Sequence, residues 1–347
     1  MADIADTLIK LCKLPGPSGF EEPVTEFVKA LLEPYMDETR IDTMGNVIAV
    51  RRCGKEGARK LLFDAHIDEI GLIITGVEEG FLRFERLGGL DMRVLPASGV
   101  EILSNPPLYG VICVMPPHVL KKEDTEKLLK IEDLYIDIGL TQEEAVAAVP
   151  PGTPAVIANL PRRFGDSFIC GKAIDDRAAF VAILRALELL KDMQLDVDLY
   201  VMASVQEEVG VRGATTGAYA VDPDWCVVVD VGHAKTPDSK PLEATEKLGE
   251  GVGIALGPNM NRELAEMALR LAKEKEIKHQ VVVVPGGSSG TNARAIQISR
   301  SGVATALFEL PLRYMHTPVE TASLDDIECA AQLMCEVAKA LKGDMLV

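Results

Sequence analysis

The chain has 347 residues, which exceeds the usual size of a single core, so we expect one large domain and a smaller one. Of its residues 48% are hydrophobic and 26% are charged, a composition typical of a globular protein. Lys and Arg number 36 against 53 Asp and Glu, so the formal net charge is −17. Such a surface repels nucleic acid and anionic membranes, and we expect neither as a partner.

The expected location is the cytoplasm. The start of the sequence lacks the basic segment and apolar core of a signal peptide. No apolar run approaches the roughly 18 residues that are needed to span a bilayer. The seven cysteines are dispersed and form no Cys-x-x-Cys pair, as expected of small buried residues in a reducing compartment.

The first 66 residues predict two helices, a hairpin and a buried strand. Apolar residues at helical spacing predict helices over 4–14 and 22–32, separated by a segment rich in proline and glycine. A hairpin is expected over 41–51. The apolar run at 60–65 predicts a buried strand that delivers His66 at its end.

Residues 70–163 have a different sequence pattern, in which short segments of alternating apolar and polar residues are separated by Gly, Pro and Asn. One short helix is predicted at 141–148, where Thr141 and Glu144 have the spacing of a capping box. We therefore expect a compact β-rich domain at 70–163, inserted into a catalytic domain that comprises 1–69 and 164–347.

From residue 171 onward, strands and helices alternate. The pattern predicts an α/β fold with a mixed, largely parallel sheet covered by helices on both faces. In such sheets, sites form beyond the carboxyl ends of the strands. The predicted helices are 177–190, 261–275 with Asn261 as N-cap, and 323–342, and the predicted strands are 197–205, 225–229, 281–284 and 303–308.

Five short segments place a histidine or a carboxylate where an apolar run ends. His66 and Asp68 are two residues apart, so in a strand they share a face, and the carboxylate can orient the imidazole. Glu207 and Glu208 are adjacent, and their carboxylates repel each other unless a cation or a shared proton compensates. The other candidates are Asp175-Asp176 before a helix, Asp230 after a strand, and His316 in a loop.

Each segment alone also has a plain structural interpretation. His66 fits a core histidine, Asp175 fits a helix cap, and Asp230 fits a solvated loop. All five segments in one chain make coincidence improbable, and the whole set in one cleft would be electrostatically untenable without cations. The sequence therefore predicts two divalent ions, with zinc, cobalt or manganese as suitable metals. The expected chemistry is metal-assisted amide hydrolysis by a water between the metals, with a carboxylate that binds no metal as the proton carrier.

These motifs, in this order, resemble the tetrahedral-aminopeptidase family of dinuclear metallo-aminopeptidases. The family includes glutamyl and deblocking aminopeptidases, and some members were once described as cellulases or endoglucanases. The resemblance covers essentially the whole chain. The motifs are Pro15-Gly16-Pro17-Ser18-Gly19, Asp64-Ala65-His66-Ile67-Asp68-Glu69-Ile70-Gly71, Gly171-Lys172-Ala173-Ile174-Asp175-Asp176-Arg177, Gln206-Glu207-Glu208-Val209-Gly210, Val229-Asp230-Val231 and Arg313-Tyr314-Met315-His316-Thr317-Pro318-Val319-Glu320.

The resemblance implies a metal-dependent aminopeptidase that hydrolyses the N-terminal peptide bond of short peptides with a free N-terminus. It implies that Asp175 bridges two metals, of which zinc and cobalt are the expected ones and manganese the alternative. It also implies that Glu207 is the general base. Asp68 is expected to orient His66. The remaining implied metal ligands are His66 and Asp230 at one metal, and Glu208 and His316 at the other.

The resemblance also implies that the α/β fold is of the phosphorylase/hydrolase-like type. It further implies a cis peptide bond between Asp175 and Asp176, and self-association from dimers to tetrahedral dodecamers. The insert at 70–163 is then expected to be a small β-barrel with a role in oligomerisation and access. The chain departs from the family pattern at Asn292, where aspartate is expected, and at His233, an extra histidine close to a ligand. These departures leave metal binding in place and substrate preference open.

Other functional classes stay open at this point. A related two-metal deacylase or carboxypeptidase-type amidohydrolase would use the same centre. A non-catalytic assembly protein is favoured by loss of a ligand or of Glu207, whereas this chain retains all of them. A glycosidase has little support, because it needs two carboxylates that flank a sugar bond and no metal pair.

Overall fold

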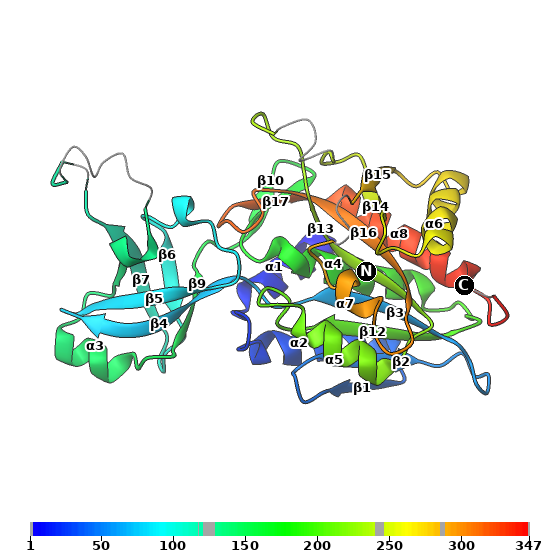
Figure 1. Cartoon of the computed structure of the whole chain (residues 1–347), viewed down its shortest axis with the longest axis horizontal. Helices are drawn as coiled ribbons and strands as arrows, with labels where there is room; N and C mark the ends of the chain where they lie inside the picture. The colour runs from blue at the N-terminus through cyan, green and yellow to red at the C-terminus, as the bar shows by residue number, and fades with distance from the viewer. Residues whose placement is uncertain (1–2, 117, 121–128, 240–245, 285–288, 346–347) are drawn as a thin grey trace.

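The computed structural model of the chain describes residues 3–116, 118–120, 129–239, 246–284 and 289–345. These residues form an eleven-stranded sheet with helices around it, and a closed six-stranded barrel at one end of the molecule (Figure 1). The predicted fold class, a mixed α/β sheet covered on both faces and a small β-barrel, is confirmed.

The sheet follows the order β1 (Glu38–Ile41), β2 (Val47–Arg51), β12 (Asp198–Ser204), β3 (Lys60–His66), β13 (Trp225–His233), β16 (Ala304–Arg313), β17 (Glu320–Ser323), β11 (Phe168–Gly171) and β10 (Arg162–Phe164), with β14 (Val252–Leu256) and β15 (His279–Val283) beside β16. The four central strands β12, β3, β13 and β16 pair in parallel, as do β14 and β15. All other pairs are antiparallel, so parallel pairing is less extensive than the alternating pattern suggested.

Helices cover both faces because apolar side chains point to both sides of the central strands. Leu61 and Phe63 of β3 join the core on the face of the larger helix set, whereas Leu62 joins the core on the opposite face. The first face carries α1 (Ile4–Lys13), α2 (Glu22–Leu32), α4 (Ile174–Leu190), α6 (Arg262–Glu274) and α8 (Leu324–Ala340), and the second carries α5 (Arg212–Val221) and α7 (Ala293–Ile296).

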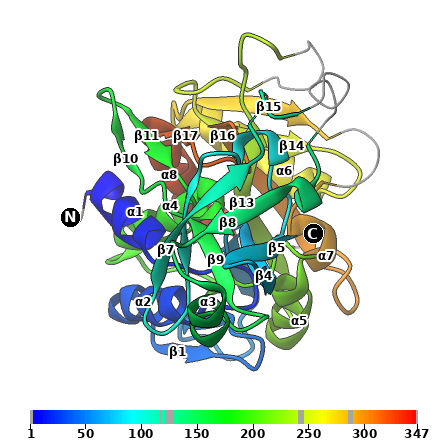
Figure 2. The same cartoon turned by 90° about the vertical axis from the view of Figure 1, so that its left-hand side faces the viewer.

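The barrel has its own apolar interior and stands apart from the sheet at one end of the molecule (Figure 1), and in the view turned by 90° it lies in front of the sheet domain (Figure 2). Leu72, Leu82, Val100, Ile112 and Ile136 are fully buried in it. Its strands close in the order β4 (Gly71–Glu78), β5 (Phe81–Leu87), β8 (Leu134–Asp137), β7 (Leu108–Val114), β6 (Gly99–Ile102) and β9 (Pro154–Ile157), and α3 (Gln142–Ala148) packs on β4 and β5.

The predicted elements are present, with some differences in their ends. Thr141 and Asn261 cap α3 and α6 as predicted. The prediction ends β13 too early, because its pairing with β16 continues to His233. The sequence patterns do not predict α5, whose two glycines and two threonines have low helix propensity, or the short strands β10, β11, β14 and β17.

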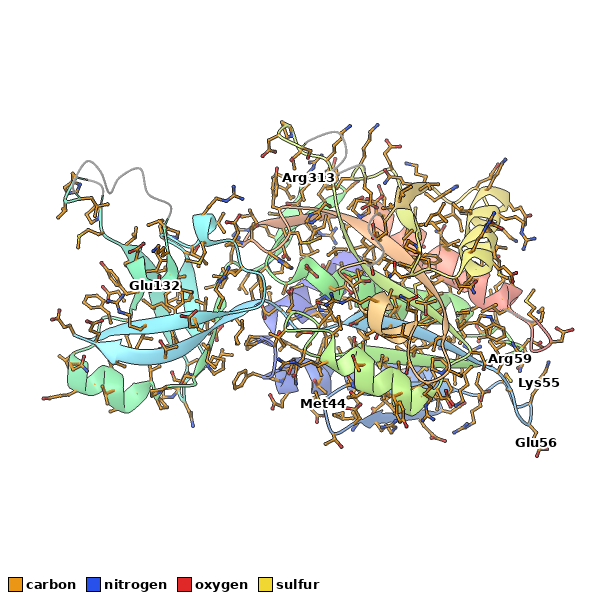
Figure 3. All side chains as sticks on the ribbon, in the orientation of Figure 1. Met44, Lys55, Glu56, Arg59, Glu132 and Arg313 are labelled. Atoms are coloured by element: carbon orange, nitrogen blue, oxygen red, sulfur yellow. The ribbon has the colours of Figure 1, made fainter. Side chains whose placement is uncertain are left out.

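Charged residues such as Lys55 and Glu56 are exposed on the sheet domain. Figure 3 labels Lys55, Glu56 and Arg59 at the end of this domain that lies farthest from the barrel. Within the described ranges, no helix is both long enough and apolar enough to cross a membrane.

Candidate metal centre

The candidate residues from the strands converge at one edge of the sheet. His66 is the last residue of β3, and Ser204 at the end of β12 pairs with it. Val228 of β13 pairs with Asp64, so Asp230 lies level with His66 and on the same face. The sequence pattern placed Asp230 after its strand, whereas β13 continues through it.

Asp175 reaches the same edge from the beginning of α4. Ala173 has a left-handed φ of 57°, and neither Asp175 nor Asp176 has helical backbone angles. The peptide bond between Asp175 and Asp176 is cis, as the family resemblance implied. Both carboxylates are buried under the ends of the central strands rather than exposed as ordinary helix caps.

His66, Asp175 and Asp230 form a first group of donors. Nε2 of His66 lies 3.1 Å from Oδ1 of Asp175. One ligand atom from each of the three residues lies within 4.8 Å of the other two. All three side chains are buried, so a cation held by them would lose most of its hydration shell.

Asp175, Glu208 and His316 form a second group, which shares Asp175 with the first. Nε2 of His316 lies 3.4 Å from Oδ2 of Asp175 and 3.3 Å from Oε2 of Glu208. The ligand atoms of this group also lie within 4.8 Å of one another. Because the two oxygens of Asp175 face different histidines, this carboxylate stands between the two groups.

The barrel segment after β5 contacts His316. Nδ1 of His316 lies 3.1 Å from the carbonyl oxygen of Gly89, and the backbone N–H of Asp91 donates to the carbonyl oxygen of His316 at 3.2 Å. A proton on Nδ1 that is donated to Gly89 leaves the lone pair on Nε2, the atom that faces Asp175 and Glu208. The imidazole is thus oriented for metal binding from the side of the barrel.

The charges of the centre are unfavourable without cations. Burial alone lowers the pKa of His316, but hydrogen bonds to Asp175 and Glu208 outweigh burial and raise this pKa to about 11. Burial raises the pKa of Asp230 well above its usual value, and that of Asp176 likewise. Without metals, the site therefore retains protons that bound cations would displace.

The donor set fits two divalent cations. Imidazole nitrogen and carboxylate oxygen are the ligands that zinc, cobalt and manganese accept in proteins. Asp176 is fully buried, and neither of its carboxylate oxygens has a hydrogen-bond partner among the described residues. Such a group is costly unless nearby positive charge compensates it. A pair of cations at Asp175 would supply that charge.

Asp68 connects His66 with the turn that carries Glu207. Its carboxylate lies 3.4 Å from Nδ1 of His66 and accepts a hydrogen bond of 2.6 Å from the hydroxyl of Ser18. It also accepts from the backbone N–H groups of Glu207 and Glu208, at 3.0 and 3.2 Å. Burial opposes ionisation of Asp68, but the hydrogen bonds from His66 and Ser18 lower its pKa overall.

Glu207 lies beside the donor groups without belonging to either. Burial raises its pKa to about 7, an effect that nearby His66 reduces and the charges of Glu208 and Asp68 reinforce. A carboxylate with a pKa near neutrality can both accept and return a proton at physiological pH.

The sequence does not single out two residues that hold the centre together. Glu320 is 1% exposed and accepts backbone hydrogen bonds from both ligand-bearing segments. The available signal was its position four residues after His316, within the last motif. Gly89 contributes only its backbone carbonyl, for which a sequence carries no signal.

The two departures from the family pattern, Asn292 and His233, lie at different distances from the metal centre. Asn292 lies under the centre, where its amide donates hydrogen bonds of 2.8 Å to Asp64 and to the hydroxyl of Ser204. An amide suits this place, because it offers a donor to the buried carboxylate of Asp64. His233 is exposed at the end of β13, outside both donor groups.

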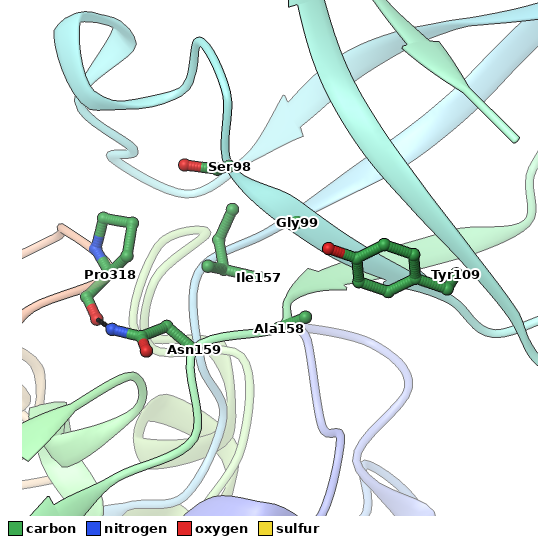
Figure 4. A pocket seen from close by; sticks show the side chains of 7 residues that line it. All are labelled: Ser98, Gly99, Tyr109, Ile157, Ala158, Asn159 and Pro318. Atoms are coloured by element: carbon green, nitrogen blue, oxygen red, sulfur yellow. Dashed lines mark hydrogen bonds between the residues drawn. The ribbon is translucent and has the colours of Figure 1, made fainter.

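A cavity of about 320 Å³ lies between the barrel and the sheet domain, separate from the metal centre (Figure 4). Asn159 and Pro318 stand on one side of it, joined by a hydrogen bond of 2.6 Å from the Asn159 amide to the Pro318 carbonyl. None of the candidate ligands lines the cavity. Its other lining residues are Ser98, Gly99, Tyr109, Ile157 and Ala158.

Known proteins match this chain over nearly its whole length. The family model of the M42 glutamyl aminopeptidases matches residues 45–333. A lysyl aminopeptidase from Pyrococcus furiosus is 35% identical over 340 residues, which cover 96% of each chain.

Solved structures agree with the family match. A TET aminopeptidase from a marine sediment archaeon of the Thaumarchaeota has a TM-score of 0.92 at 34% identity, with 98% of this chain and 96% of that chain covered. The TET1 peptidase of Pyrococcus horikoshii, described as assembling into a tetrahedron or a large octahedral shell, has a TM-score of 0.85 at 33% identity, with 98% and 100% covered.

Proposed function

The chain belongs to the M42 glutamyl aminopeptidase family, and we propose that it is a two-metal aminopeptidase that removes the N-terminal residue from short peptides. The position of Asp175 is the observation that supports this most, because its two oxygens lie 3.1 and 3.4 Å from Nε2 of His66 and His316. Asp230 completes the donors on one side and Glu208 on the other.

The proposed metals are zinc or cobalt, with manganese as an alternative, since all three accept this ligand set. His66, Asp175 and Asp230 would hold one ion, and Asp175, Glu208 and His316 the other. When bound, two such ions lower the pKa of a water between them and polarise the carbonyl of the scissile bond.

Glu207 is proposed as the general base. Its carboxylate takes the proton of the attacking water and returns it to the leaving amine. Asp68 positions this base, because it accepts the backbone N–H of Glu207 while it faces Nδ1 of His66. The surplus of carboxylates also attracts the positively charged free N-terminus of a peptide.

The barrel domain, taken as residues 70–163, is proposed to serve self-association and to limit access to the centre. Two observations support this: the barrel contacts His316 through Gly89 and Asp91, and the TET1 relative is described as assembling into closed shells. The cytoplasm is the proposed location, on the strength of the dispersed cysteines.

The proposal is tested by metal analysis and a substrate panel on one preparation. Purified protein should contain two divalent ions per chain and release the first residue from aminoacyl reporters, with lysyl and glutamyl reporters included. Removal of metal with a chelator should abolish turnover, and added zinc or cobalt should restore it. Equal activity on N-acetylated peptides would favour a deacylase or another amidohydrolase instead.

The adjacent carboxylates Glu207 and Glu208 provide a matched pair of variants. Glu207→Gln should keep both metals and lose about 10²- to 10⁴-fold in kcat, since it removes only the proton carrier. Glu208→Gln should lose metal from one position. Full turnover in Glu207→Gln would remove this residue from the role of base.

A further inference from the structure

We propose that Glu320 is a positioning residue that holds Asp175 and His316 in place for metal binding, an inference that rests on the two-metal function proposed above. Glu320 is the first residue of β17 and is 1% exposed. Neither the motif pattern nor the ligand geometry assigns it a role.

Each carboxylate oxygen of Glu320 binds a different segment of the centre. Oε2 accepts from the backbone N–H groups of Ile174 and Asp175, at 2.9 and 3.2 Å. Oε1 accepts from the backbone N–H of His316 at 3.1 Å. One side chain therefore joins the segment of the shared ligand to the segment of the second histidine.

Neither segment is held by regular secondary structure. Asp175 lies at the non-helical start of α4, where backbone N–H groups have no acceptor within the helix. His316 has a left-handed φ of 60°, a backbone conformation that is uncommon for a residue other than glycine. Glu320 supplies the acceptors that these segments lack, and thereby fixes the backbone from which both ligands project.

Glu320 itself is anchored in the sheet. Its backbone pairs with Gly171 of β11, and the following residue Thr321 pairs with Arg313 of β16. The carboxylate is therefore fixed relative to the strands on either side of it. Ligands that are supported from a rigid element keep the geometry that metal binding requires.

The role demands a carboxylate. A glutamine at this position has one acceptor and one donor, so its NH₂ group would face the N–H of one of the two segments. Glu320→Gln thus keeps the size of the side chain but releases one segment. The hydrogen bonds of Glu320 reach the backbone of Asp175 and of His316. The loss of metal affinity should therefore be largest for the ion that Asp175, Glu208 and His316 would hold.

Asp326 offers a matched control away from the centre. It is also 1% exposed, and it accepts the backbone N–H groups of Gly249 and Gly251 at 2.8 and 2.7 Å. Asp326→Asn therefore makes the same chemical change in an equally buried carboxylate that binds two backbone donors. A purely structural effect of the substitution would appear in both variants.

The test is a calorimetric titration of metal-stripped protein with Zn²⁺. Wild type should bind two ions, and in Glu320→Gln one of the two affinities should fall about 10- to 100-fold while the other changes little. Saturating zinc should restore most of the turnover of this variant. Asp326→Asn should keep both affinities.

The outcomes separate the inference from the function on which it rests. Wild type that binds no zinc would overturn both, whereas wild-type affinities in Glu320→Gln would overturn the role of Glu320 alone. If Glu320→Gln fails to fold, amide hydrogen exchange on metal-free wild type decides: protection at 174, 175 and 316 supports the inference, and fast exchange there overturns it.

Discussion

The buried carboxylate of Asp68 supports both the proposed metal ligand His66 and the proposed base Glu207. Its Oδ1 lies 3.4 Å from Nδ1 of His66 and accepts the backbone N–H of Glu207, while its Oδ2 accepts the backbone N–H of Glu208. Ser18 adds a hydrogen bond from the loop that follows α1. A change at Asp68 should therefore affect metal binding and proton transfer together.

We expect Asp68→Asn to reduce kcat/KM by about 10- to 100-fold and to weaken zinc binding, because an amide replaces one acceptor by a donor. Steady-state kinetics on an aminoacyl reporter and zinc titration would measure both effects. Ser18→Ala should cause a smaller loss, since it removes only one of the bonds to Asp68. An Asp68→Asn enzyme within twofold of wild type would contradict this view.

Glu246 is a buried acid outside the two donor groups. It is 3% exposed, and burial together with Glu309 and Asp326 raises its pKa from the ordinary value of 4.5 to about 9. Between these two pH values the folded protein keeps a proton that the unfolded chain has released. Rising pH therefore favours unfolding, and the stabilising contribution is complete only below pH 4.5.

Glu246→Gln should consequently stabilise the protein at alkaline pH and have little effect at pH 5. The difference in melting temperature between variant and wild type should grow as the pH rises toward 9, because glutamine stays neutral throughout. Thermal unfolding monitored at several pH values would measure it. Glu143→Gln on the exposed face of α3 serves as control, and a constant offset between Glu246→Gln and wild type would refute the assignment.

At the scale of elements, the sequence predicts the buried strands before His66 and Glu207 best, whereas it ends β13 too early. The apolar run before His66 correctly predicts β3, since such runs are typical of strands buried on both faces, and the alternating segment before Glu207 correctly predicts β12. The caps Thr141 and Asn261 were equally visible, since capping depends on local spacing.

Tertiary contacts determine what the sequence did not show. Asp230 is level with His66 only through strand register, which a single apolar run does not encode. The left-handed backbone of His316 and its bond to Glu320 depend on neighbours that are distant in sequence. Predicting the residue types of the centre was therefore possible, whereas predicting their support was not.

The turn between β12 and α5 carries Glu207, and Gly213 allows it to close. A Cβ at Gly213 would collide with the carbonyl oxygen of Val205 and with Oδ1 of Asn46. We expect Gly213→Ala to lower the free energy of unfolding by about 1–3 kcal/mol and to reduce kcat, because relief of the clash displaces the turn. Urea unfolding and reporter kinetics would measure the two effects.

Gly76→Ala in β4 is the matched control, since a Cβ there meets no atom within 4 Å. It should change the free energy of unfolding by less than about 0.5 kcal/mol and leave kcat unchanged. Equal effects of the two substitutions would show that the clash at Gly213 is relieved without moving the turn.

At the scale of the whole molecule, apolar side chains remain exposed on both domains. Tyr109 of the barrel is 66% exposed, and Phe164 and Val283 of the sheet domain are 59% and 68% exposed. The self-association proposed above would cover exposed apolar side chains where they form contiguous patches. Light scattering should give a mass several times the 37.5 kDa of one chain, and a monomer at micromolar concentration would contradict self-association.

Metal removal should destabilise the whole chain, because the proposed ligands come from β3, β13, α4 and the loops after β12 and β16. An ion that binds only the folded state adds about 2.7 kcal/mol at a concentration 100 times its Kd. We expect chelator to lower the melting temperature and zinc to restore it.

Acid should have the same effect as chelator, since protons compete with metal at His66, His316 and the carboxylates. The gain in melting temperature on adding zinc should therefore shrink as the pH falls from 7 toward 5. His316→Ala should show a smaller gain at neutral pH, because it removes a donor of only one group. A gain that is the same in this variant and in wild type would mean that zinc stabilises the protein from somewhere other than the site built around Asp175.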